Sequence, residues 1–95
     1  MSTMEPRWEA LFSPRWRVLC YGAAFYLRRL AKCDRRFVDR VLARQREEAW
    51  ELVEAGFLPR PIHDGLKAQL ENPTGSREMR DVAQALVRFA SSGAF

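Results

Sequence analysis

The sequence has little of what catalytic and metal sites are made from. Its 95 residues include two cysteines and a single histidine. Cys20 and Cys33 do not form a closely spaced pair, and His63 stands apart from both, so a zinc site would need ligands from unrelated elements. Phosphate-loop, dinucleotide-binding and nucleophile-elbow motifs are also missing from the sequence. We therefore expect no metal, no cofactor and no enzymatic activity.

The chain also lacks a long hydrophobic run. The longest one, Val18 to Leu27, has ten residues, whereas a membrane-spanning helix needs about 20. Arg28 and Arg29 follow it at once with no small-residue cleavage site between, which argues against a signal peptide. On one helix, Cys20 and Cys33 would lie roughly 20 Å apart, too far for a disulfide. We expect reduced thiols and a cytoplasmic location.

Lysine is nearly absent, because the chain has two lysines against fourteen arginines. Arginine suits bidentate pairing with carboxylates and phosphates. A GC-rich genome would produce the same bias, and the sequence leaves both explanations open. The net charge is +4, with 47% hydrophobic and 29% charged residues, which is ordinary for a globular protein of one domain.

The hydrophobic periodicity is that of helices throughout, and no segment alternates long enough to be a strand. Ser13 and Pro14 are a cap and a first residue for a helix that runs to about Lys32. Asp34 is a cap for a second helix to about Ala55, with Gly56 just beyond its end. One continuous helix over 14–55 remains an alternative, because no glycine or proline separates Lys32 from Asp34.

The fold class predicted is all-α, a small single domain over residues 1–95. Its parts are an N-terminal arm (1–13), a long antiparallel helical hairpin (14–55), a proline-containing linker (56–61), a shorter C-terminal helix pair (62–90) and a tail (91–95). Within the pair, the last helix is expected to have Ser76 as its cap. The inward stripe predicted for the second helix comprises Val38, Val41, Leu42, Ala49, Leu52 and Val53.

The first long helix has apolar residues on two opposite faces. Its main stripe comprises Trp16, Leu19, Cys20, Ala23, Leu27 and Leu30, and Val18, Tyr21 and Phe25 lie opposite. Trp50 similarly lies about 120° from the centre of the second helix's stripe. Aromatic residues off the core are typical of interface hot spots. The apolar partner-binding residues predicted are Val18, Tyr21, Phe25 and Trp50; alternatively, the C-terminal helix pair covers this face.

A basic cluster occupies residues 28–46, with eight bases against two acids. The basic partner-binding residues predicted from it are Arg28, Arg29, Lys32, Arg35, Arg36 and Arg40. Such a cluster attracts phosphate or an acidic protein surface. An acidic run follows at Glu47, Glu48, Glu51 and Glu54, and in a hairpin it would lie beside Arg15 and Arg17.

These features predict a small non-enzymatic protein-interaction module that binds and regulates or inhibits a larger protein. In size and arginine-rich helical character the chain is similar to many short accessory proteins of GC-rich bacteria and their phages. The alternative is a basic nucleic-acid-binding regulator, with 61–71 and 76–90 as a loose helix-turn-helix outline. Arg77 and Arg80 suit that role, whereas Glu78 and Asp81 oppose it. The expected partner is a protein with an acidic surface, and a homodimer remains open.

Overall fold

The structure is a computed structural model that describes residues 14–56 and 58–92, and the predicted arm (1–13) lies outside them. These residues form helices and no strand, so the all-α fold class is confirmed. The helices are α2 (Pro14–Leu30), α3 (Arg35–Val41), α4 (Ala43–Ala55), α5 (Arg60–Glu71) and α6 (Ser76–Ser91).

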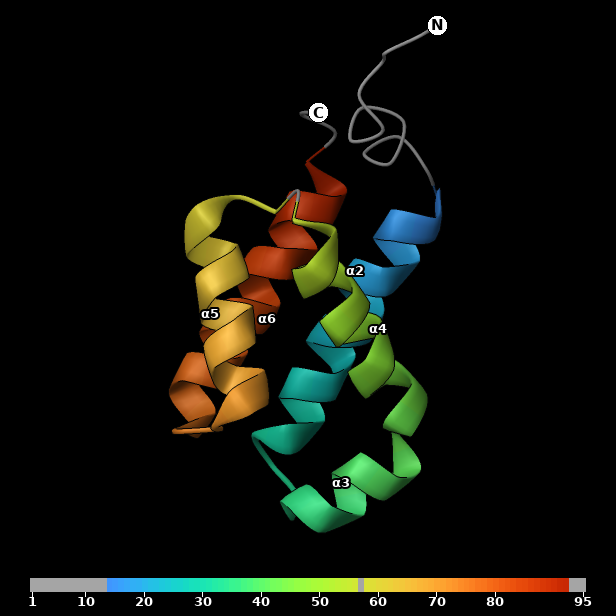
Figure 1. Ribbon diagram of the computed structural model, residues 1–95. Helices are drawn as coiled ribbons and strands as arrows, with labels where there is room; N and C mark the ends of the chain where they lie inside the picture. The colour runs from blue at the N-terminus through green and yellow to red at the C-terminus, as the bar shows by residue number, and fades with distance from the viewer. Residues whose placement is uncertain (1–13, 57, 93–95) are drawn as a thin grey trace, which may run out of the picture.

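The four longer helices, α2, α4, α5 and α6, run alternately down and up, so that each is antiparallel to the next (Figure 1). The central helix is α2, which packs along both α4 and α6, while α5 packs against α4 and α6 on the other side of the core. The short helix α3 joins α2 to α4 and lies beyond the turn between α5 and α6 (Figure 1). The hairpin therefore projects past the helix pair at this end.

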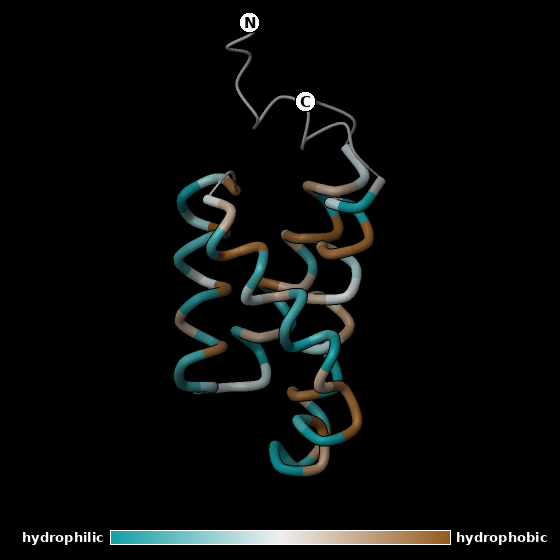
Figure 2. The backbone as a smooth tube through the Cα atoms, turned by 45° about the vertical axis from the view of Figure 1, so that its right-hand side comes forward, coloured by the Kyte–Doolittle hydropathy of each residue, from teal (hydrophilic) through white to brown (hydrophobic). Residues whose placement is uncertain are grey.

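The core lies between these helices, and hydrophobic positions recur at each turn facing it (Figure 2). Viewed along the axis of α2, the buried residues span an arc of about 160°, from Tyr26 at one edge to Ala24 at the other, if each residue turns the helix by about 100°. It is this wide because α4 and α6 share it, and it leaves the opposite face of α2 outside the core. The buried hydrophobic residues of α2 are Leu19, Cys20, Ala23, Ala24, Tyr26, Leu27 and Leu30.

The chain turns after Leu30, so the alternative of one continuous helix is wrong. The amide N–H of Cys33 donates to the carbonyl of Arg29 at 2.8 Å, which closes the end of α2. Asp34 then caps α3, because its carboxylate accepts a hydrogen bond from the Phe37 amide at 3.3 Å. The predicted hairpin break and its aspartate cap are thus both present.

The second arm of the hairpin is interrupted, which the sequence does not predict. Leu42 has φ −111° and ψ 37°, outside the helical region, and it separates α3 from α4. Because this residue changes the direction of the chain, the apolar positions on its two sides no longer share a face. Val38, Ala49, Leu52 and Val53 are buried as predicted, whereas the inward position predicted for Val41 is wrong, since Val41 is 57% exposed.

The helix pair differs from the prediction at both of its starts. Helix α5 begins at Arg60, so Pro61 lies in its first turn rather than in the linker, where its missing N–H costs nothing. Gly75, not Ser76, is the N-cap of α6. The turn between them is held by Gln69, whose side chain accepts from the Thr74 amide and donates to the Thr74 hydroxyl, both at 3.1 Å.

Gly56 ends α4 with φ 74°, the left-handed conformation that a β-carbon disfavours. Gly56→Ala is expected to lower the free energy of unfolding by about 1 kcal/mol, measured by urea denaturation. Gly22→Ala is the control, because Gly22 lies inside α2, where its new Cβ would displace the flexible end of the Glu48 side chain and meet Gln45 at an ordinary contact distance. An equal loss in both variants would contradict the conformational explanation.

Candidate functional site

Within the residues that the structure describes, the face of α2 opposite the core is exposed. Val18 is 58% exposed, Tyr21 44% and Phe25 46%, so the C-terminal helix pair does not bury the second apolar stripe. The Tyr21 hydroxyl shares a 2.8 Å hydrogen bond with the Ser91 hydroxyl at the end of α6, which fixes its ring beside that helix. Large apolar side chains thus line successive turns of one exposed helix face without completing the core.

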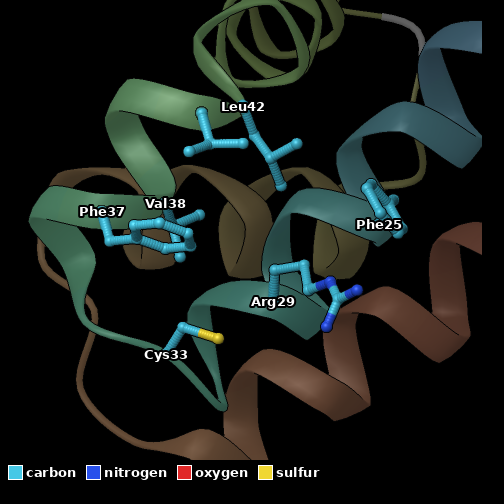
Figure 3. A pocket seen from close by; sticks show the side chains of 7 residues that line it. Phe25, Arg29, Cys33, Phe37, Val38 and Leu42 are labelled. Atoms are coloured by element: carbon cyan, nitrogen blue, oxygen red, sulfur yellow. The ribbon is translucent and has the colours of Figure 1, made fainter.

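A hollow of about 330 Å³ continues this stripe at the hairpin end. Phe25 and Arg29 of α2 stand on one side of it, and Phe37 and Val38 of α3 on the other (Figure 3). Cys33, before α3, and Val41 and Leu42, at its end, complete the lining. The turn after Leu30 and the break at Leu42 position these walls, since they fold α3 back beside the last turns of α2.

The lining is mainly apolar, with Arg29 as its one charged member among the seven. The Arg29 guanidinium lies 5.6 Å from the centre of the Phe25 ring, which is a cation–π contact. Phe37 is 50% exposed, so both aromatic walls present ring surface to solvent. The hollow is therefore suited to a large apolar group that carries negative charge beside it.

Most of the predicted basic residues are sequence neighbours of the residues that line this hollow. Arg28, Lys32, Arg36 and Arg40 each directly precede a lining residue, and all four are exposed. Within residues 14–56 and 58–92, no ion pair involves any of these four. Arg35, the other predicted base, pairs with Asp39 at 3.5 Å. The segment that supplies most of the lining therefore has an excess of bases over acids.

The two acids of this region are used within the fold. Asp34 caps α3. Asp39 accepts a hydrogen bond from the buried hydroxyl of Tyr26 and lies 3.9 Å from Nε of Arg46. That nitrogen is buried and makes no hydrogen bond, so Asp39 is its nearest source of negative charge. This cluster joins α2, α3 and α4, and the two acids offset part of the positive charge of residues 28–46, which hold eight bases.

Trp50 differs from the other predicted apolar residues, because it is partly buried and packs against the core. Arg15 pairs with Glu51, which is the hairpin contact expected for the acidic run. Sequence reasoning missed Cys33, Phe37, Val41 and Leu42 as part of one site with Phe25. The spacing of Phe37 and Val41, four residues apart, was the available signal, since it places them on one helix face.

The two cysteines are free and lie in opposite environments. Cys20 is buried, and this burial raises the pKa of its thiol to about 11. Cys33 is exposed in the hollow. We expect a maleimide at neutral pH to label Cys33 and to reach Cys20 only after unfolding, because the thiolate is the reactive form. Mass spectrometry of Cys20→Ser and Cys33→Ser measures this, and equal labelling of both thiols would contradict the placement.

No group of three or more histidine, cysteine, aspartate or glutamate side chains in the described residues is arranged to hold a metal ion. Over the same residues, no helix has the length and apolar character that crossing a bilayer requires. Comparison with protein-family models, with curated proteins and with solved structures gives no match. The surface of the described residues is therefore the basis on which a function can be proposed.

Proposed function

We propose that this chain is a small non-enzymatic protein-interaction module that binds a larger protein and regulates or inhibits it. The observation that carries the proposal is the apolar stripe of Val18, Tyr21 and Phe25, which is exposed on a helix whose other face already completes the core. Contiguous exposed apolar surface rimmed by charged residues is typical of protein-binding sites. Aromatic residues and arginine, which are enriched in binding hot spots, form both the stripe and its rim.

The proposal extends to the setting in which the module works. Two free thiols, one of them exposed, suit a reducing compartment, and we place the protein in the cytoplasm of a bacterium or of a phage-infected cell. We propose that its role there is that of an accessory protein, because the described residues offer an exposed apolar surface of the kind that binds other proteins.

The experiment is affinity capture with the immobilised protein, followed by reconstitution with the purified captured protein. We expect Phe25→Asp and Tyr21→Ala to abolish capture, because they remove apolar contacts from the stripe. Arg80→Ala is the matched control, since Arg80 is exposed on α6, on another part of the surface. A partner that binds all three variants equally would show that this face is not the binding site. Recovery of no partner under any condition would overturn the proposed function.

Nucleic-acid binding is the second candidate, favoured by Arg28, Lys32, Arg36 and Arg40, which are exposed and form no ion pair within residues 14–56 and 58–92. If this candidate is right, the protein binds RNA or DNA, and the binding weakens steeply as the salt concentration rises. Arg36→Glu should then abolish the binding. On α6, by contrast, Arg77 and Arg80 alternate with the exposed acids Glu78 and Asp81, which would face phosphate. Unchanged mobility of RNA and DNA at low salt removes this candidate.

A further inference from the structure

The shape of the site at the hairpin end restricts what it binds. The hollow of about 330 Å³ lies between two half-exposed phenylalanines, Phe25 and Phe37, and aliphatic side chains complete most of its lining. A concave apolar site of this kind accepts a protruding side chain, as hot-spot pockets do. A membrane surface has no protruding side chain that would fill the hollow. A flat or convex apolar face would bind a membrane equally well, so the concave shape favours a protein ligand.

The charge around the hollow restricts the partner further. Arg28, Lys32, Arg36 and Arg40, each next to a lining residue in the sequence, are exposed and form no ion pair within the described residues. Residues 28–46 hold eight bases and only two acids. Complementary charge steers association and excludes partners of like charge. A second copy of this chain would bring the same bases onto the same surface, so this electrostatic pattern favours an acidic partner over self-association.

The spacing of the exposed apolar stripe on α2 indicates the secondary structure of the partner segment that would bind there. Phe25, Tyr21 and Val18 lead away from the hollow along α2, and the rise from Phe25 to Val18 is about 10 Å, or two helical turns. A helix lying against this stripe would place apolar anchors at i, i+4 and i+7, the spacing of helix-in-groove recognition. An extended peptide would instead present side chains of one face about 6.6 Å apart, further apart than the roughly 5 Å mean spacing of this stripe.

From these three features we propose that the hollow and the stripe bind an acidic amphipathic helix of the partner protein. One bulky apolar side chain of this helix enters the hollow between Phe25 and Phe37, and the next two pack on Tyr21 and Val18. Its acidic residues face Arg28, Lys32, Arg36 and Arg40. This inference rests on the proposed function and specifies the partner's chemistry.

The test is selection from a displayed library of random peptides of about 16 residues, roughly four helical turns. We expect the selected peptides to be rich in glutamate and aspartate, with large apolar residues at i, i+4 and i+7. Fluorescence anisotropy of a selected peptide should show at least about tenfold weaker binding to Val41→Glu, which places a charge at the hollow. Gln84→Glu, on the exposed surface of α6, is the matched control and should bind normally.

Several results would overturn this inference. They are selection of basic peptides, selection of peptides without the helical spacing, selection of none, and binding that Val41→Glu leaves unchanged. Tighter binding of the protein to phosphatidylserine vesicles or to single-stranded RNA than to the selected peptide, lost in Val41→Glu, would assign the site to those ligands instead. Both variants are at exposed positions, and circular dichroism verifies that they fold.

The failure of this inference is distinguishable from the failure of the proposed function. Suppose that a captured protein depends on Phe25 for binding, but that neither salt nor Arg36→Glu weakens the binding. The proposed function would then stand, and the proposal of an acidic helix as the ligand would be wrong. Absence of any partner that depends on Phe25 would remove the proposed function itself. Affinity capture thus tests whether this face of α2 binds a protein, and peptide selection tests whether the ligand is an acidic helix.

Discussion

Replacing Leu27 with aspartate is expected to abolish folding, whereas the same replacement at Phe25 should leave the protein folded. Leu27 of α2 is fully buried in the core, whereas Phe25, two residues earlier on the same helix, is 46% exposed. An aspartate at Leu27 has no partner in the core, and burying its carboxyl while losing the leucine contacts costs an amount comparable with the roughly 5–15 kcal/mol that stabilise a small domain. At Phe25 the cost is about 1 kcal/mol, since the contact with Arg29 and part of a ring are lost.

The measurement is urea unfolding followed by circular dichroism at 222 nm. We expect no cooperative transition for Leu27→Asp and a transition close to that of the wild type for Phe25→Asp. Leu27→Ala serves as the intermediate case, with an expected loss of about 2–5 kcal/mol. If Phe25→Asp also unfolds the protein, the second stripe of α2 belongs to the core, and the proposed binding face loses its basis.

The second large effect is expected at the cluster that joins α2, α3 and α4. Asp39→Ala should lower the free energy of unfolding by about 2–4 kcal/mol. It leaves the buried hydroxyl of Tyr26 and the buried Nε of Arg46 without their carboxylate. Tyr26→Phe should cost less, about 1 kcal/mol, because Asp39 keeps its arginine partners. Asp64→Ala is the control: this aspartate also pairs with an arginine but is exposed, and little change is expected.

This cluster also predicts how stability changes at high pH. Burial, and then the hydrogen bond to Asp39, raise the pKa of Tyr26 from 10.0 to about 12. Because the folded state holds this proton more tightly than the unfolded state, its contribution to stability is complete below pH 10 and is lost as pH rises from 10 to 12. Tyr26→Phe should therefore lose less stability across that interval. An equal loss in both proteins would contradict the assigned role of the Tyr26 hydroxyl.

Local sequence signals predicted the elements that depend on single residues. Proline at the start of α2, Asp34 at the start of α3 and Gly56 at the end of α4 each act through their own backbone geometry or side chain, so the sequence was sufficient there. The break at Leu42 has no such marker, because neither glycine nor proline is present. It arises from packing of α3 and α4 on α2, which a linear pattern does not contain.

The candidate site was predictable only in part for the same reason. The exposed stripe of Val18, Tyr21 and Phe25 follows from helical periodicity, once the width of the core arc on α2 is known. The hollow depends on two non-local facts, the reversal of the chain after Leu30 and the break at Leu42, which bring Phe37 opposite Phe25. Tyr26 lies at the edge of the predicted stripe, and it is buried because α4 and α6 share one face of α2.

The central claim is that the folded chain leaves this face open for a different protein. The most direct test is the solution mass, by light scattering on a sizing column after nuclease treatment, at low and high salt. We predict a monomer of 11.1 kDa in both, because the exposed bases around the hollow oppose pairing with a second copy. A dimer that Phe25→Asp converts to a monomer would contradict the claim, since a second copy would then cover the stripe.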